Sequence, residues 1–205
     1  MRIGVLASGN GTDFQSIIDA VDNGDVTADI VVLISNKIDA YALERARKHR
    51  IPAICIPHGG MSREEHELEV ANALDAHKVD LVVLAGYLRM MTTYLVDKYR
   101  WRMMNVHPAL LPRFGGKGMH GERVHRAVLD AGCKVSGCTV HFVTEDVDGG
   151  PIIAQKSVPV LEGDTPETLA KRVLDAEHTL LPRAIQLFAE GKLKVVDGKR
   201  VRVLD

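Results

Sequence analysis

The sequence predicts a single α/β domain with a doubly wound, mostly parallel, Rossmann-like sheet and an antiparallel addition near its C-terminal end. Apolar runs rich in Val, Ile and Leu recur along the chain with few polar interruptions, as in strands that are buried on both faces. Amphipathic stretches with helical spacing separate these runs. The length of 205 residues is typical of one domain with a sizeable core.

The apolar runs predict four strands, at residues 2–7, 28–35, 51–56 and 80–85, and a more mixed run predicts a fifth near 101–106. Apolar side chains at helical spacing predict helices between these strands. They are Phe14, Ile17, Ile18 and Val21 after the first strand, and Val70, Ala73 and Leu74 before the fourth. The alternation of strand and helix predicts the doubly wound sheet.

The pattern changes after Val140. Residues 139–143 and 152–158 flank the turn sequence Asp148-Gly149-Gly150-Pro151, which predicts an antiparallel strand pair. A long helix follows, with Asp164 or Thr165 as its N-cap, Pro166 in its first turn and Pro182 as the place for a kink, ending near Leu187. Asp197-Gly198 then predicts a two-residue hairpin turn.

The composition is ordinary for a soluble protein, with 46% hydrophobic and 26% charged residues. A formal net charge of -1 gives no strong attraction to nucleic acid or to an anionic membrane. The first apolar run stops at Ser8-Gly9, which is too short for a signal peptide or a membrane span, so we expect a cytoplasmic location. The three cysteines contain no CxxC pair, which argues against a disulfide framework and a structural zinc site.

The first candidate site is Ser8-Gly9-Asn10-Gly11-Thr12, where the first strand should pass into the first helix. Glycines let backbone amides approach an anion, and the helix N-terminus adds partial positive charge, so a phosphate would fit. The segment is neither GxGxxG nor a P-loop, which gives little support to a dinucleotide fold or an ATPase. A plain tight turn is equally compatible, and Asp13 would repel phosphate unless it points away or caps the helix.

The second candidate site is the strand end around Asn105 and His107. These residues are two apart, so in an extended chain their side chains share a face. An amide donor and an imidazole at the C-terminal edge of a parallel sheet suit oxyanion stabilisation and proton movement. On spacing alone, a loop-capping Asn105 and a packed or surface His107 are the more ordinary interpretation.

The third candidate site is the acidic turn from Thr144 to Asp148. If Asp148 lay beside His107, its charge would raise the pKa of the imidazole, favour the protonated ring and fix its orientation. A solvated acidic loop is the alternative.

Taken together, these segments resemble the folate-dependent formyltransferase family. The matching residues lie in the same order and at similar intervals along the whole chain, which makes the set specific although each segment alone is weak. The segments are 8–12, 35–37, 85–89, 105–112 and 147–151.

The resemblance implies formyl transfer from 10-formyltetrahydrofolate, used as co-substrate, to the amine of 5-phosphoribosylglycinamide in de novo purine biosynthesis. It implies a formyltransferase domain over residues 1–205, with a ribonucleotide-binding N-terminal half and a folate-binding, catalytic C-terminal half. We expect no metal, because His120 and His125 have no acidic or Cys partner at ligand spacing. We expect no nucleic-acid or membrane partner, and a homodimer is left open.

The resemblance also implies roles for individual residues. Those of the reaction centre are Asn105, His107 and Asp148, with His107 as a protonated donor. Those of the ribonucleotide site are Gly11, Thr12, Asp13 and Glu177. Those of the folate site are Arg63, Leu88, Arg89, Met90, Met91, Asn105, Thr144, Glu145, Asp146, Val147 and Asp148.

Two of these assignments are open from the sequence. The family usually has Asn where this chain has Asp13, and Glu177 without the resemblance would be interpreted as a solvated helix charge. The glycine-rich segment 115–121 is either a mobile flap or a surface loop, and Lys117 receives no role.

Three other functions compete with this one. Methionyl-tRNA formyltransferases and formyltetrahydrofolate hydrolases share the reaction centre, but they normally carry an additional domain that we do not expect in a chain of this length. A catalytically silent nucleotide- or folate-binding protein is the alternative from another class. A proton-transfer centre argues against it, since binding alone does not need one.

Overall fold

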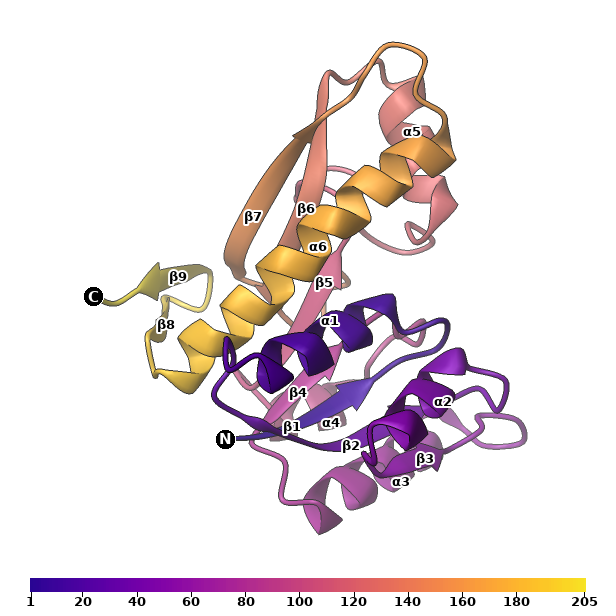
Figure 1. Ribbon diagram of the computed structural model, residues 1–205. Coiled ribbons are helices and arrows are strands. Elements are labelled where there is room, and N and C mark those ends of the chain that lie inside the picture. The colour runs from indigo at the N-terminus through magenta and orange to yellow at the C-terminus, as the bar shows by residue number, and fades with distance from the viewer. The chain divides into compact units, whose positions relative to one another are not determined.

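The computed structural model describes residues 1–205, which form two compact units, Met1–Asn105 and Val106–Asp205 (Figure 1). Seven strands are hydrogen-bonded in the order β3-β2-β1-β4-β5-β6-β7. The pairs β2-β3, β1-β2, β1-β4 and β4-β5 are parallel, whereas β6-β7 is antiparallel. The predicted fold class is therefore confirmed, while the single domain with functional halves stays a prediction.

The strands of the first unit lie where apolar runs predict them. They are β1 (Arg2–Leu6), β2 (Asp29–Ser35), β3 (Ala53–Cys55), β4 (Leu81–Leu84) and the start of β5 (Met103–His107). β1, β2 and β4 are almost entirely buried, which explains their continuous apolar sequence. β3 is shorter than the predicted range because it is an edge strand with half-buried side chains.

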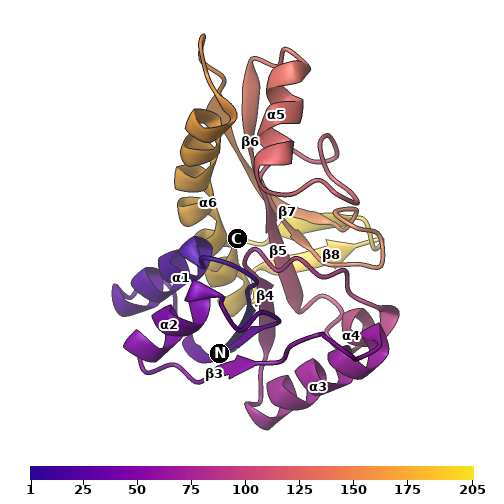
Figure 2. The same cartoon turned by 90° about the vertical axis from the view of Figure 1, so that its right-hand side faces the viewer.

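Helices cover both faces of these strands. α1 (Thr12–Asp22) and α2 (Tyr41–Lys48) pack together on one side, and α3 (Arg63–Ala76) and α4 (Thr93–Lys98) pack together on the other (Figure 2). The predicted positions Phe14, Ile17 and Ile18 form the buried face of α1. This arrangement is the doubly wound layer order that the sequence predicts.

The second unit is built on the predicted antiparallel pair. It contains α5 (Glu122–Asp130), β6 (Val135–Phe142), β7 (Ile152–Pro159), α6 (Pro166–Ala189), β8 (Leu193–Val196) and β9 (Arg200–Val203). α6 packs against β6 and β7 (Figure 2). β6 begins before the predicted residue 139 and includes Gly137. A Cβ at Gly137 would lie 2.1 Å from the Lys156 carbonyl oxygen, so this strand position requires a glycine.

The ends of α6 and the final hairpin refine two predictions. Thr165 is the N-cap of α6, because its side chain accepts a hydrogen bond from the Thr168 N–H, and the helix continues through Pro182. In the hairpin, Asp197 and Gly198 both have positive φ angles, as predicted. Val196 pairs with Arg200, so Lys199 is a third loop residue and the prediction of a two-residue loop was wrong.

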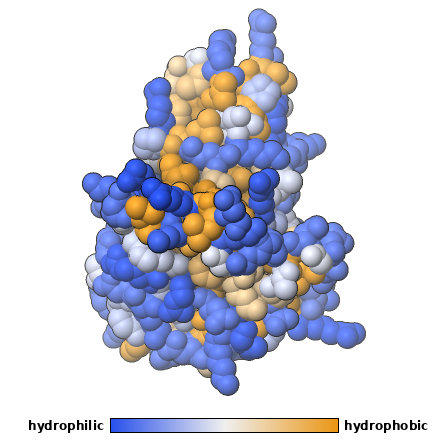
Figure 3. Space-filling view, turned by 90° about the vertical axis from the view of Figure 1, so that its left-hand side faces the viewer, coloured by the Kyte–Doolittle hydropathy of each residue, from blue (hydrophilic) through white to orange (hydrophobic).

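The face drawn in Figure 3 is mostly hydrophilic, with scattered hydrophobic groups between the polar ones. None of the helices combines the length and the apolar character that crossing a bilayer requires.

Candidate active site

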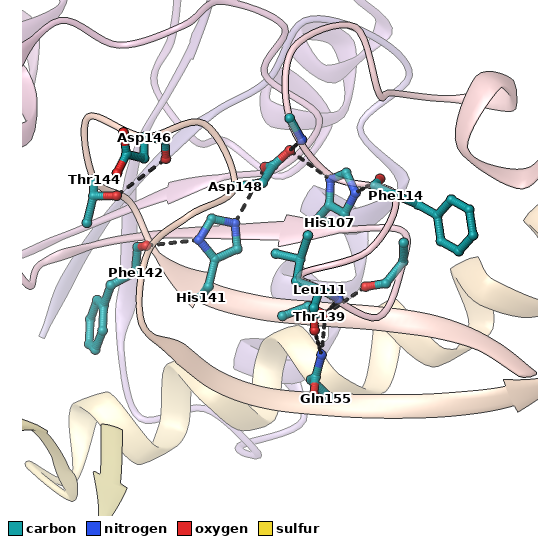
Figure 4. A network of polar contacts seen from close by, with 12 residues as sticks. His107, Leu111, Phe114, Thr139, His141, Phe142, Thr144, Asp146, Asp148 and Gln155 are labelled. Carbon is teal, nitrogen blue, oxygen red and sulfur yellow. Dashed lines mark hydrogen bonds and ion pairs between the residues drawn. The ribbon is translucent and has the colours of Figure 1, made fainter. Parts of the chain in front are cut away.

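The carboxylate of Asp148 lies between two histidine rings (Figure 4). Its Oδ2 atom is 3.4 Å from Nδ1 of His107, at the end of β5, and its Oδ1 atom is 3.7 Å from Nε2 of His141, on β6. The side chains of His107, His141 and Asp148 are only 4%, 3% and 11% exposed. The structure thus brings together His107 and Asp148 as expected, and Asp148 is largely enclosed although residues 145–147 of the same acidic loop are exposed.

The backbone holds Asp148 in this position. Asp148 has a φ angle of +56°, in the left-handed region that costs energy for a residue other than glycine. The N–H of Gly116 donates to Oδ2 of Asp148 at 2.9 Å. Gly115 leaves no room for a side chain, because a Cβ there would lie 2.5 Å from Cδ2 of Leu111 and 3.2 Å from Cβ of Asp148. The glycine-rich segment, which the sequence left as either a mobile flap or a surface loop, therefore contacts the carboxylate and helps to position it.

The ring of His107 has an acceptor at each nitrogen. Nε2 donates to the carbonyl oxygen of Phe114 at 2.8 Å, and Nδ1 faces Asp148. Burial has the largest effect on the pKa of His107 and lowers it; the charge of Asp148 and the Phe114 carbonyl raise that pKa, but by less. Asp148 thus acts with the predicted sign. Burial outweighs the carboxylate, so the pKa of His107 in the free chain lies below its ordinary value. Donation by a protonated His107 during the reaction stays a prediction.

Asp148 is held as a carboxylate. Burial is the largest single influence on its pKa and raises it, but the hydrogen bond with His141, the charge of His107 and the Gly116 amide together outweigh burial. The pKa of Asp148 therefore lies below its ordinary value. At neutral pH the site therefore contains a largely buried carboxylate beside two histidine rings.

The loop that follows His107 is fixed by side chains of β6 and β7 (Figure 4). The hydroxyl of Thr139 accepts from the Leu111 N–H at 3.0 Å and donates to the Ala109 carbonyl at 2.7 Å. Gln155 Nε2 donates to the Leu111 carbonyl at 2.9 Å. These bonds hold the chain just after His107, so the imidazole is attached to a backbone that is fixed in place.

Asn105 lies two residues before His107 on β5 and is half-buried. Successive side chains of a strand alternate, so Asn105 and His107 point to the same side of β5. Its part in the reaction stays a prediction.

The predicted phosphate loop leads into α1 as expected. Gly11 is the N-cap of α1, with a φ angle of +71°, and a Cβ there would lie 2.7 Å from Cβ of Ala42. Only glycine fits this position, and Thr12 and Asp13 then begin the helix. Arg45 fixes the loop from α2, because its Nε donates to the Asn10 carbonyl at 2.8 Å.

The carboxyl group of Asp13 is enclosed although the residue is partly exposed, since its Oδ1 atom has almost no accessible surface. Burial raises the pKa of Asp13 to about 6. Asp13 is therefore ionised only in part at mildly acidic pH, and its charge is costly to bury.

The predicted folate residues fall in both units. Arg63 begins α3 and is exposed, and the segment from Leu88 to Met91 follows β4. Residues 144–148 form the loop between β6 and β7. The predicted ribonucleotide residue Glu177 is on α6 and only 6% exposed, so the interpretation of a solvated helix charge is wrong.

Sequence reasoning missed His141, Phe114 and Gly116 as members of this site. The only signal for His141 was a histidine inside the apolar run that ends at the acidic turn. No three His, Cys, Asp or Glu side chains form a group that could hold a metal ion. The expectation that no metal is needed stays a prediction.

Comparison with known proteins gives consistent matches over the chain. The family model described as "Formyl transferase" matches residues 1–185. A phosphoribosylglycinamide formyltransferase of Escherichia coli is 40% identical, over 98% of this chain and 96% of that protein. The chloroplastic phosphoribosylglycinamide formyltransferase of Arabidopsis thaliana is 42% identical, over 94% of this chain and 67% of that protein.

Two further matches concern a longer protein and a solved structure. The trifunctional purine biosynthetic protein adenosine-3 of Bos taurus is 42% identical over 98% of this chain, which spans 19% of that protein. The crystal structure of glycinamide ribonucleotide transformylase 1 from Symbiobacterium toebii has 48% identity and a TM-score of 0.94, covering 100% of this chain and 94% of that one.

Proposed function

We propose that this chain, which belongs to the formyl transferase family, transfers the formyl group of 10-formyltetrahydrofolate to the amine of 5-phosphoribosylglycinamide. The products are formylglycinamide ribonucleotide and tetrahydrofolate. The observation that carries the proposal is the buried pairing of His107 with an ionised Asp148, in a chain that matches its relatives along nearly its full length.

The reaction needs donors more than a nucleophilic side chain. When the neutral amine attacks the formyl carbon, a tetrahedral species forms and negative charge develops on the formyl oxygen. Preorganised donors stabilise that charge, and Asn105 and His107 fill this role in the proposal. The formyl group passes directly from the folate nitrogen to the amine nitrogen, so no covalent intermediate with the chain is required.

The histidine becomes a stronger donor as the reaction proceeds. In the free chain His107 is neutral and its Nε2–H is bonded to Phe114. A developing oxyanion adds to the charge of Asp148 in raising the pKa of the ring, so the ring takes up a proton from solvent and donates as an imidazolium. The ring returns that proton to solvent when the carbonyl of the product forms again. To donate to the formyl oxygen, Nε2–H of His107 gives up its hydrogen bond to the Phe114 carbonyl and forms one to the formyl oxygen. Asp148 organises the water that carries a proton from the attacking nitrogen to the leaving folate nitrogen.

The ligand sites follow the same proposal. Gly11, Thr12, Asp13 and Glu177 bind the ribonucleotide, while the folate contacts Arg63, the segment Leu88–Met91, Asn105 and the loop 144–148. The folate is the co-substrate and no metal takes part. A cytoplasmic location completes the proposal.

An acceptor assay tests this function. Release of tetrahydrofolate is followed with 5-phosphoribosylglycinamide, with charged tRNA and with water as the only acceptor. We expect rapid release only with the ribonucleotide, together with its formylated product. Equal release without any acceptor would identify a hydrolase, formylated tRNA would identify a tRNA formyltransferase, and binding of both substrates without turnover would identify a silent binding protein.

A further inference from the structure

Ser8 joins three loops of the first unit. It follows β1 and is 2% exposed. Its hydroxyl donates to Oδ1 of Asn36 at 2.6 Å and accepts from the N–H of Leu88 at 2.9 Å. Its own N–H donates to the Gly86 carbonyl at 3.1 Å. One buried residue therefore makes three hydrogen bonds to the loops that follow β2 and β4.

These loops lie at the same edge of the sheet. β1, β2 and β4 are parallel, so their carboxyl ends meet where ligands bind in this architecture. The chain bends at Gly86, which has a φ angle of +69°, directly beside the two bonds from Ser8. Ser8 thus fixes both the position and the direction of the chain as it leaves β4.

The segment beyond this bend is held at its other end by Glu67. This carboxylate is 3% exposed and accepts from the Thr92 N–H at 2.6 Å and from the Thr92 hydroxyl at 2.5 Å. Between the two anchors, the backbone groups of residues 89–91 make no hydrogen bond within the chain. Unpaired backbone groups on a partly exposed segment are available to a ligand.

The side chains of the segment agree with this interpretation. Leu88 is 53% exposed and Met90 is 37% exposed, so an apolar surface accompanies the free backbone groups. A flat ring with polar edges, such as that of a folate, fits such a surface. Hydrogen bonds hold both ends of the segment, and its middle is accessible to a ligand. A residue that holds one end can therefore affect how well the middle binds the ligand.

We propose that Ser8 is a positioning residue for the folate, which it places by fixing the segment from Gly86 to Met91. This inference rests on the proposed function, which assigns Leu88 to Met91 to the folate site. Loss of the hydroxyl would leave the partly buried Leu88 N–H and the buried Asn36 amide oxygen without their partner, and the segment would shift to regain hydrogen bonds.

Ser35 provides a matched control. It is also a serine with its side chain buried, at the end of the neighbouring strand β2, with 0% exposure. Its hydroxyl donates to the Lys37 carbonyl at 3.1 Å and accepts from the Lys37 N–H at 3.2 Å. Ser35→Ala therefore removes a similar number of buried hydrogen bonds without touching the segment after β4.

The first measurement compares the two substrates. We expect Ser8→Ala to raise the KM for 10-formyltetrahydrofolate about tenfold, as the loss of one or two buried hydrogen bonds implies, and the ribonucleotide KM clearly less. Ser35→Ala should leave the ratio of the two KM values unchanged. An equal or larger rise in the ribonucleotide KM of Ser8→Ala would overturn the inference, as would a similar folate effect in the control.

The second measurement does not depend on turnover. Without ligands, amide hydrogen exchange in peptides covering residues 86–91 should be faster in Ser8→Ala than in the wild type and in Ser35→Ala. Calorimetry with tetrahydrofolate should show about tenfold weaker binding by Ser8→Ala. Faster exchange with unchanged folate binding would overturn the positioning role. If the wild type transferred no formyl group but Ser8→Ala still weakened tetrahydrofolate binding, the proposed function would fail while this inference stood.

A milder variant, Asn36→Ala, keeps the proposal testable if Ser8→Ala does not fold. It removes the acceptor of the Ser8 hydroxyl proton but keeps the hydrogen bond from the Leu88 N–H to Ser8. It should change folate binding in the same direction as Ser8→Ala, by a smaller factor. An Asn36→Ala protein with weaker ribonucleotide binding and unchanged folate binding would contradict the proposal even if Ser8→Ala did not fold.

Discussion

At the scale of single residues, the carboxylate of Asp148 stands out because it serves several partners at once. It faces His107 and His141 and accepts from the Gly116 amide. A buried charge is costly unless it is paired and hydrogen-bonded, and these partners compensate for that cost. Ionisable groups with perturbed pKa values cluster at functional sites, so this group of side chains is a candidate functional site.

Removal of any member of the reaction centre should slow the reaction while the fold persists. We expect His107→Ala, Asn105→Ala and Asp148→Asn each to lower kcat by about 10² to 10³, the usual cost of one donor to a developing oxyanion. Steady-state kinetics measures the loss, and circular dichroism checks the fold. His49→Ala, an exposed histidine of the first unit, is the control and should keep the wild-type kcat. Near wild-type turnover in two of the three variants would remove the assignment.

The titration of His107 in the Asp148→Asn protein shows whether the charge of Asp148 acts on that ring, which a purely structural role of Asp148 would not do. The Asp148 charge raises the pKa of His107 against the effect of burial. Its removal should therefore move the titration of His107 to lower pH, as measured by NMR of the ring protons. An unchanged titration would show that the two side chains are not coupled.

The sequence could predict only part of this site. His107 and Asp148 were found because each lies in a motif of its own segment. Gly116 and His141 could not be found in this way, since they act on Asp148 from other segments and only the fold brings them close. The neutral state of His107 also depends on burial, which the sequence does not reveal.

At the scale of elements, the predictions succeed where a strand is buried on both faces. β1, β2 and β4 are apolar without interruption, so their sequence patterns are unambiguous. The edge strand β3 and the glycine-containing start of β6 deviate from their predicted bounds. α4 has only six residues, which are too few to show a helical period, and it was not predicted individually.

The N-cap of α6 offers a test at this scale. α6 packs against β6 and β7, so a loss of helix stability reaches the sheet of the second unit. Thr165→Ala removes the acceptor of the Thr168 N–H and should lower the free energy of unfolding by about 1 kcal/mol. Urea denaturation measures the change. Thr93→Ala, at the start of α4 where the side chain is exposed and makes no hydrogen bond, should change the stability by much less.

At the scale of the whole molecule, the residues predicted for each ligand site lie far apart along the chain. The folate set includes Arg63 and Leu88 in the first unit and Asp148 in the second, and the ribonucleotide set includes Gly11 and Glu177. No run of adjacent residues could therefore reveal either site. The sequence succeeded because the order and spacing of several segments were compared together, which a single motif does not permit.

At the scale of the whole molecule, Asp13 makes a contribution to stability that changes with pH in a direction that the structure predicts. Burial raises the pKa of Asp13 from 3.8 to about 6, so the folded chain holds this proton more tightly than the unfolded chain. Its contribution to stability is complete below about pH 4 and is lost as the pH rises to about 6.

Asp13→Asn should therefore gain about 1 to 3 kcal/mol over the wild type between pH 4 and pH 7.5, because each unit of pKa shift corresponds to about 1.4 kcal/mol and Asn has no charge to bury. Urea denaturation at both pH values measures this difference. Asp25→Asn, which alters an exposed carboxylate after α1, should show no such change with pH. If the wild type instead gained stability relative to Asp13→Asn as the pH rises, the folded chain would favour the charged form of Asp13. The conclusion that burial makes this charge unfavourable would then be wrong.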